Sequence, residues 1–166
     1  MAAKSLNDIK EFTPSSFEDE RGDIYTVHKD QEGGLRYNHD KVCTRSGGVL
    51  VGIHGDFDTN KFVSCLYGRI YCAIVDYRDD SVDYLKHKTF VLSAENKRQL
   101  LIPPGFGNSF LVMSNMCVYL YKLGYSGEYT DCDKQFTLRW DDPKLGIYWP
   151  IKNPILSQRD AEAQLL

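Results

Sequence analysis

Three side chains of the types that move protons stand in patterned stretches of this sequence. His54 directly follows the apolar run 48–53, Tyr121 lies in the run 117–123, and Asp160 falls in the first turn of an expected C-terminal helix. A histidine titrates at about 6.5 and can accept a proton near neutral pH, whereas a tyrosine, which titrates at about 10, holds one ready to give. Such a set suits acid–base chemistry. Each residue alone also fits a structural role, as a strand-end histidine, a core tyrosine or a helix-terminus carboxylate.

Short strands separated by turns must position these side chains. Turn signals occur at Glu20-Arg21-Gly22, Tyr67-Gly68, Pro103-Pro104-Gly105 and Ser114-Asn115. The runs on either side of Tyr67-Gly68 and of Ser114-Asn115 are predicted to pair as hairpins. Many closely spaced short strands favour an all-β sandwich or barrel, and without a repeat or linker we expect one domain over residues 1–166. The expected strands are 23–28, 48–53, 62–66, 69–77, 88–92, 99–102, 109–113 and 117–123, and a helix capped by Ser157 is expected over 157–165.

Composition narrows the classes of function. Apolar residues make up 42% of the 166, which is enough for a core. The formal net charge is −3, and the sequence contains no long run of residues with the same charge. This argues against a nucleic acid or an anionic membrane as the main partner. No stretch approaches the roughly 18 apolar residues of a membrane span, and the N-terminus lacks a signal-peptide pattern. Five scattered cysteines without a Cys-x-x-Cys spacing favour reduced thiols in the cytoplasm.

Blocks of sequence along nearly the whole chain occur in the order found in one enzyme family. From about Phe17 to Asp160 they resemble the dTDP-4-dehydrorhamnose 3,5-epimerase family. No single block decides the matter, but their common order is hard to obtain by chance. The blocks are FEDERG at 17–22, NH at 38–39, GVLVGIH at 48–54, KFVSC at 61–65, LSAENKRQL at 92–100, IPPGF at 102–106, YK at 121–122, WDDP at 140–143, GIYWP at 146–150 and LSQRD at 156–160.

The resemblance implies an all-β fold, a cupin-like jelly-roll β-barrel with a few short peripheral helices. It also implies a homodimer that exchanges an N-terminal strand between subunits, and chemistry that needs neither cofactor nor metal. The expected substrate is a nucleotide-diphosphate-linked 4-keto-6-deoxy sugar or 4-keto-heptose, inverted at C3, C5 or both by proton removal and return. Such a step belongs to the biosynthesis of capsule, O-antigen or deoxysugars.

Matching positions carry the family's catalytic roles over to this chain. His54 matches the base that removes a proton beside the ketone, and Asp160 matches its partner, since a carboxylate on the second ring nitrogen fixes the tautomer. Tyr121 matches the acid on the opposite face of the sugar. Lys61 matches a lysine near the ketone oxygen, where an ammonium offsets developing negative charge. The expected substrate contacts are Arg21, which matches a diphosphate-binding arginine, together with Asn38, Asn108 and Lys122.

Two positions depart from the family pattern. The family block usually reads Arg-Gly-Leu-His, whereas this chain has Val51-Gly52-Ile53-His54, so the arginine and its contact are missing. A histidine usually follows the Pro-x-Gly-Phe-Ala stretch, whereas Asn108 stands there in this chain; asparagine can hydrogen-bond but cannot act as an acid or base at neutral pH. The stretches 54–56, 107–109 and 123–129 are similar to epimerases of GDP-linked 4-keto-heptoses, so we expect a substrate other than the dTDP-rhamnose precursor.

Three other kinds of protein compete with this interpretation. A metal-dependent cupin enzyme would supply histidines two apart on one strand, but Asp56 takes the second position, and His28, His39 and His87 show no ligand spacing. A sugar 3,4-ketoisomerase on the same fold remains an alternative. A non-catalytic sugar-nucleotide-binding cupin is the third, although pure binding needs no acid–base set. The nucleotide base, the sugar length, the number of centres inverted and the pathway product stay open.

Overall fold

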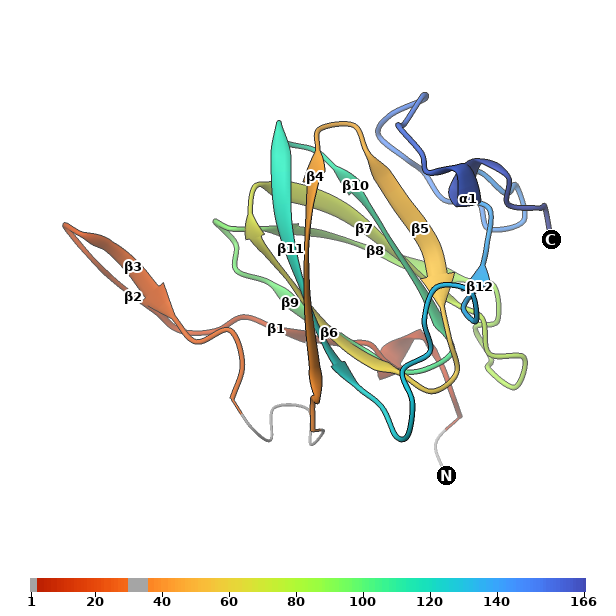
Figure 1. The fold of residues 1–166 in the computed structure, drawn as a ribbon, viewed down its shortest axis with the longest axis horizontal. Helices are drawn as coiled ribbons and strands as arrows, with labels where there is room; N and C mark the ends of the chain where they lie inside the picture. The colour runs from red at the N-terminus through yellow and green to blue at the C-terminus, as the bar shows by residue number, and fades with distance from the viewer. Residues whose placement is uncertain (1–2, 30–35) are drawn as a thin grey trace.

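The computed structural model describes residues 3–29 and 36–166, and two facing antiparallel sheets of five strands each dominate it (Figure 1). This arrangement confirms the predicted all-β jelly roll with few and short helices. The first sheet contains, in order, β1 (Lys10–Phe12), β9 (Gln99–Ile102), β6 (Asn60–Tyr67), β11 (Met116–Gly124) and β4 (His39–Ser46). The second contains β12 (Phe136–Thr137), β5 (Leu50–Gly55), β10 (Phe106–Val112), β7 (Arg69–Asp76) and β8 (His87–Ser93). Outside them lie the pair β2 (Ser16–Asp19) and β3 (Gly22–Tyr25), the 3-10 helix η1 (Leu6–Asp8) and the helix α1 (Gln158–Ala161).

Side chains from the inner faces of the two large sheets pack in the space between them. On β10, Phe106, Phe110 and Val112 belong to the core cluster there, and on β11 Cys117 and Tyr119 do. Their spacing by two residues, or by four, follows from the alternation of side chains along a strand. All five are almost completely buried, so this part of the barrel is a packed core.

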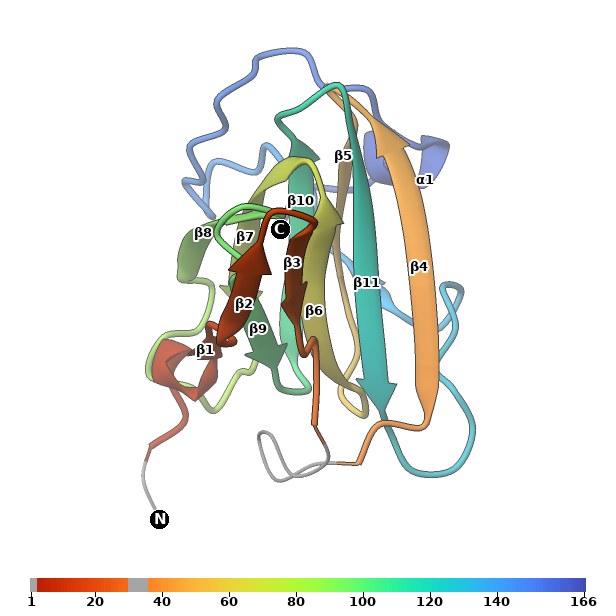
Figure 2. The ribbon, with the colours of Figure 1, turned by 90° about the vertical axis from the view of Figure 1, so that its left-hand side faces the viewer.

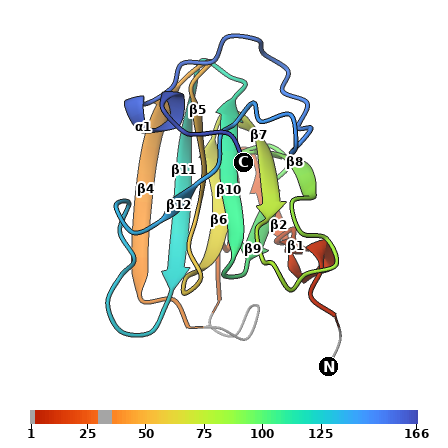
Figure 3. The same ribbon diagram turned by 90° about the vertical axis from the view of Figure 1, so that its right-hand side faces the viewer.

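The chain after β12 covers the outer face of the second sheet (Figure 3). Leu50 and Leu111 pack there against Trp149, while Ile53 packs with Leu138 in a neighbouring cluster. The strands β5, β10 and β7 of the second sheet are therefore largely buried on both faces. That is why β5 and β7 look like continuous apolar runs in the sequence, without a clear alternation.

The hairpins predicted around Tyr67-Gly68 and Ser114-Asn115 are wrong, because each turn joins strands of different sheets. β6 leads into β7, and β10 into β11, across the same end of the barrel. The two turns touch, with the amide of Arg69 donating to Ser114 Oγ at 2.9 Å. Gly68 has a φ of +77°, and a Cβ there would lie 2.2 Å from the carbonyl oxygen of Met116. A glycine turn between two strands gives the same local signal for a hairpin and for a corner between sheets.

The other predicted elements differ mainly in extent. β9 has the expected bounds, whereas the helix expected over 157–165 is reduced to the four residues of α1. Ser157 caps it as predicted, its Oγ accepting from the amide of Asp160 at 3.2 Å. Strands β1, β2, β4 and β12 were not predicted. Among the described residues, no helix has the length and apolar character needed to cross a membrane.

The β2–β3 hairpin stands away from the barrel in Figure 1 and faces the viewer in Figure 2. Its apolar side chains Phe17 and Ile24 are 66% and 71% exposed. Lys97, between β8 and β9, pairs with Asp23 of β3 and donates to Ser16 Oγ of β2 at 2.8 Å. The hairpin thus leaves an apolar surface uncovered by its own chain.

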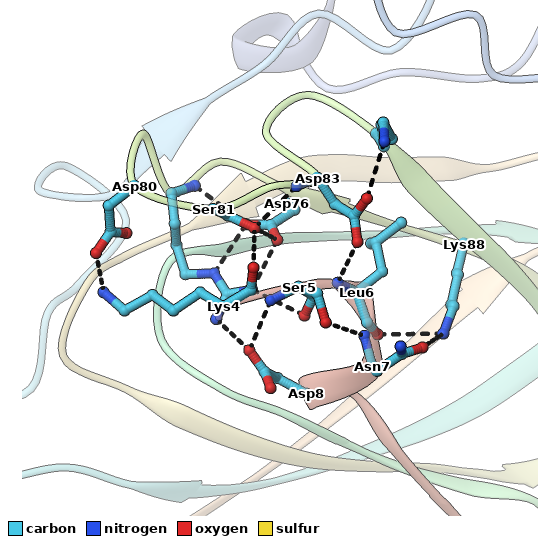
Figure 4. A network of polar contacts seen from close by, with 12 residues as sticks. Lys4, Ser5, Leu6, Asn7, Asp8, Asp76, Asp80, Ser81, Asp83 and Lys88 are labelled. Atoms are coloured by element: carbon cyan, nitrogen blue, oxygen red, sulfur yellow. Dashed lines mark hydrogen bonds and ion pairs between the residues drawn. The ribbon is translucent and has the colours of Figure 1, made fainter. Parts of the chain in front are cut away.

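A polar network fastens the N-terminal segment to the loop after β7 (Figure 4). Asp76, which is fully buried, accepts a hydrogen bond from Arg78 Nη2 at 2.6 Å, and Arg78 Nη1 donates to Asp8 at 2.8 Å. Asp83 accepts from the backbone amide of Leu6 at 3.0 Å. A buried carboxylate is tolerated here because a charged partner and hydrogen bonds compensate it.

Candidate active site

A cavity of about 500 Å³ lies between the two sheets, beside α1. Five of the eight predicted site residues line it, and they come from five different elements. The second sheet and α1 contribute one wall, and the first sheet contributes the facing wall. These residues are His54 on β5, Asn108 on β10, Asp160 on α1, Lys61 on β6 and Tyr121 on β11.

A bulge in β5 turns His54 into this cavity. Val51 lines the cavity, so strict alternation would point Ile53 inward and His54 outward. The register between β5 and β10 shifts by one residue there. Gly52 has a φ of +102°, a backbone conformation in which residues other than glycine are strained. As a result Ile53 packs on the outer face, and His54 shares the inner face with Val51.

His54 and Asp160 form a close pair. His54 Nε2 lies 2.5 Å from Asp160 Oδ1, and the second carboxylate oxygen accepts from Ser157 Oγ at 2.8 Å and from the amide of Gly52 at 3.4 Å. Asp160 is only 3% exposed. Burial raises the pKa of its carboxyl, but the hydrogen bond and charge of His54, with Ser157 and Gly52, outweigh it and hold the pKa below the ordinary value. The carboxylate therefore stays ionised and fixes the orientation of the imidazole.

Lys61 projects from the facing sheet and is 7% exposed. Its Nζ lies 3.5 Å from Oδ2 of Asp56, whose other oxygen accepts from the amides of Asp58 and Thr59 at 3.0 and 2.6 Å. Burial lowers the pKa of Lys61, and the carboxylate of Asp56 opposes that shift. An ammonium held this way can face a developing negative charge in the cavity.

Tyr121 lies on the same wall as Lys61. Its strand, β11, is between β6, which carries Lys61, and the edge strand β4. Its ring meets that of Tyr119 edge-on, with centroids 4.7 Å apart. Burial raises the pKa of Tyr121 well above the ordinary value. The phenol therefore keeps its proton at neutral pH, on the wall opposite His54.

The match to known proteins agrees with this geometry. The family model described as dTDP-4-dehydrorhamnose 3,5-epimerase matches residues 3–166. The chain belongs to this family. Its members are isomerases, which confirms the predicted class of enzyme.

Individual relatives match over almost the full chain. The dTDP-4-dehydrorhamnose 3,5-epimerases of Shigella flexneri and Escherichia coli strain K12 are each 34% identical, with 96% and 93% of this chain and 91% and 88% of those proteins covered. Among solved structures, the epimerase RmlC of Legionella pneumophila in complex with dTDP-4-keto-L-rhamnose has a TM-score of 0.89 at 32% identity, covering 98% of this chain and 90% of that one. The Bacillus anthracis enzyme with TDP and PPi bound has a TM-score of 0.90 at 30% identity, covering 98% and 97%.

Sequence reasoning missed several polar residues of the epimerase cavity. Lys41 and Arg45 reach it from β4, and Arg159, next to Asp160, lines it with Nε donating to Thr137 Oγ1 at 2.8 Å. Nζ of Lys41 lies 4.8 Å from the ring centroid of Tyr129, and Tyr129 also lines the cavity. The alternation of Lys41, Cys43 and Arg45 was the signal that could have found β4, but too few apolar residues accompany it.

Three predicted site residues are not among the described residues that line the cavity. Arg21 lies at the turn of the β2–β3 hairpin, 81% exposed at its side chain, and pairs with Asp19. Lys122 points the other way from Tyr121 and binds Asp40 at 2.8 Å. Asn38 donates to the carbonyl oxygen of Tyr125 at 3.3 Å. In the described part of the chain, no three His, Cys, Asp or Glu side chains gather as metal ligands would.

Proposed function

We propose that this chain inverts C3, C5 or both of a nucleotide-diphosphate-linked 4-keto sugar by removing and returning a proton. One observation carries the proposal: the His54–Asp160 pair and the protonated Tyr121 face each other across one cavity, with Lys61 beside Tyr121 on its wall. Inversion at a carbon next to a ketone needs a base on one face, an acid on the other and a group that stabilises the enolate.

Each of these residues has a defined part in the reaction. With the Nε2 hydrogen directed at Asp160, the Nδ1 lone pair of His54 takes the proton from carbon. The C–H electron pair forms the C=C bond of the enolate, and the π pair of the ketone moves to its oxygen. Lys61 stabilises that oxygen. Tyr121 then gives its proton to the opposite face of the carbon while the enolate C=C pair forms the new C–H bond. The phenolate, disfavoured by burial, takes a proton from solvent, and the His54 imidazolium releases its proton to solvent.

The diphosphate is assigned to the remaining cations of the cavity. Lys41, Arg45 and Arg159 supply three positive charges, against the single negative charge of Asp160, the one carboxylate among the described lining residues. Guanidinium groups suit the planar, bidentate recognition of phosphate oxygens. This charge balance favours an anionic, phosphorylated ligand over a neutral sugar.

The three other expected substrate contacts would reach a substrate only at an interface between subunits; they are Arg21, Asn38 and Lys122. We assign the exposed Phe17 and Ile24 of the β2–β3 hairpin to a homodimer contact, in which the hairpin brings Arg21 toward the cavity of the partner subunit. Apolar side chains of this exposure suit an interface better than solvent. The free state of all five thiols suits a reducing compartment, the cytoplasm.

The substrate is sought first among dTDP-linked sugars, because the Legionella and Bacillus proteins were solved with dTDP-4-keto-L-rhamnose and with TDP. The test is proton NMR in deuterated water with dTDP-, GDP- and CDP-linked 4-keto-6-deoxy sugars and 4-keto-heptoses. Loss of the C3 or C5 signal, with an inverted product, supports the proposal and counts the centres. A product with its ketone at C3 would instead identify a ketoisomerase, and binding without any exchange would identify a binding protein.

A further inference from the structure

Asp56 carries a buried carboxylate in the turn between β5 and β6, and it is only 3% exposed. Its Oδ1 is fixed by two backbone donors, the amides of Asp58 at 3.0 Å and of Thr59 at 2.6 Å. Its Oδ2 is buried and has no hydrogen-bond partner among the described residues. A buried carboxylate oxygen without a hydrogen bond is costly, so a nearby positive charge has to compensate it.

The ammonium of Lys61 provides that charge. Its Nζ lies 3.5 Å from Oδ2 of Asp56, a distance that fits an ion pair better than a hydrogen bond. An ion pair of this length holds the ammonium by charge and leaves its three N–H donors for other acceptors. Because Lys61 lines the cavity, an acceptor on a bound ligand can use them.

Asp56 is the negative charge that acts on Lys61. Burial lowers the pKa of Lys61, and the carboxylate of Asp56 opposes that shift. Asp58, in the same turn, is exposed, so solvent screens its charge. Asp160, the one carboxylate among the described residues that line the cavity, is already paired with His54 on the opposite wall.

The other titratable groups around Lys61 supply no negative charge at neutral pH. The neighbouring strand β9 has no titratable side chain, and β11 contributes the phenol of Tyr121, whose pKa burial raises well above the ordinary value. Three cations, two thiols and a second phenol also line the cavity; they are Lys41, Arg45, Arg159, Cys43, Cys132 and Tyr129. Cations disfavour a further positive charge, so the charge on Lys61 depends on Asp56.

We propose that Asp56 is a positioning residue, whose fixed carboxylate keeps the Lys61 side chain a charged ammonium at the cavity wall. This inference rests on the proposed function. Asp56 is not among the described residues that line the cavity, so it acts through Lys61 and not on the substrate itself. Because no short hydrogen bond ties the ammonium to Asp56, its donors can turn to the ketone oxygen as negative charge develops there.

The experiment follows kcat/KM for deuterium exchange into the sugar from about pH 6 to about pH 10, in the unaltered protein and in Asp56→Asn. Asparagine keeps an oxygen for the two backbone donors but removes the charge. The alkaline fall of kcat/KM reports the proton loss of a group that the free enzyme needs protonated. Burial lowers the pKa of Lys61 and raises that of Tyr121, so the first alkaline fall is assigned to Lys61.

This fall should occur about 1–3 pH units lower in Asp56→Asn, because an opposite charge nearby shifts a pKa by about that much. At a pH above both falls, the variant should therefore be about 10–10³-fold slower than the unaltered protein. At a pH below both, the two proteins should exchange at similar rates.

Nuclear magnetic resonance of isotope-labelled lysine side chains measures the charge on Lys61 without any substrate. The variant Lys61→Met identifies the signal by its loss. The titration midpoint of this signal should match the alkaline fall of kcat/KM, and both should move together in Asp56→Asn. Asp80→Asn is the matched control, because Asp80 pairs with Lys4 at 2.6 Å and neither is among the described residues that line the cavity. It should move neither midpoint.

A purely structural role of Asp56 would lower kcat/KM by the same factor at every pH. That result, or a Lys61 midpoint unchanged by Asp56→Asn, would overturn the proposal. So would an uncharged Lys61 at neutral pH in the unaltered protein, a measurement that needs no folded variant at position 56. Absence of exchange by the unaltered protein with every sugar tested refutes the proposed function instead, and the titration of Lys61 still decides whether Asp56 holds its charge.

Discussion

The substitution Gly52→Ala tests whether the bulge in β5 places the base. Gly52 has a φ of +102°, and a Cβ there would lie 2.6 Å from the carbonyl oxygen of Asn108 and 3.0 Å from Cβ of Ser109. Backbone strain of this kind costs about 1–3 kcal/mol, and overpacking a further 1–3 kcal/mol. The sum of about 2–6 kcal/mol corresponds to a fall in Tm of about 4–24 °C for a chain of this length.

The rate of deuterium exchange into the sugar should also fall, by more than the loss of stability explains. If β5 relieves the strain by losing the bulge, the alternation of side chains returns to its regular phase and His54 turns toward the outer face. Even a displacement of His54 by 1 Å would cost about 10²-fold in rate. The assay is deuterium exchange at a temperature where melting curves show that the variant is fully folded.

Gly146→Ala provides the matched control. Gly146 also has a positive φ, +59°, but nothing lies within 4 Å of its added Cβ. The substitution Gly146→Ala should therefore lower the free energy of unfolding by only about 1–2 kcal/mol and leave the rate of deuterium exchange unchanged. If Gly52→Ala behaves like Gly146→Ala in both measurements, the bulge does not position His54 and the reasoning is refuted.

Three further predictions concern the proton-transfer residues. His54→Ala should lower exchange by about 10²–10⁴-fold without changing the circular dichroism spectrum, and wild-type exchange would remove His54 as the base. Tyr121→Phe should retain exchange at one carbon but lose net inversion in NMR product analysis; normal inversion would mean that another group is the acid. The pKa of Asp160 is lowered in the folded protein, so its ionised form stabilises the fold above its ordinary value of 3.8, and this contribution is lost as the pH falls through the lower folded pKa. Urea midpoints from about pH 5 to pH 2 should therefore fall less steeply in Asp160→Asn, and parallel curves would contradict an ionised pair.

The strand positions could be predicted from sequence, whereas the pairing of several strands could not. Apolar runs and turn residues located β5 to β11 within a few residues, because those signals are local. The corners at Gly68 and Ser114 could not be told from hairpins, since the choice depends on contacts between the turns themselves. β4 was missed because its inward side chains include Lys41 and Arg45, which face a cavity and not an apolar core.

The candidate site shows the same limit. The resemblance pointed to five residues that the fold brings together, but alternation alone would have turned His54 away from Val51. Only the backbone conformation of Gly52 resolves this, and a glycine in a strand does not by itself reveal a bulge. Arg159 was overlooked for a similar reason, because a charged residue on a short helix usually faces solvent.

The paired His54 and Asp160 stand 106 positions apart in the chain, and β6, β10 and β11, which lie between them in the sequence, supply other lining residues of the cavity. Contacts between residues so distant in sequence form slowly, because a long loop must close first. α1 can dock only after β5 and its neighbours have assembled. Recovery of exchange during refolding will therefore report the last step of folding, while a spectroscopic signal from the strands reports earlier ones. A nascent chain that lacks its final residues has no partially working catalytic centre.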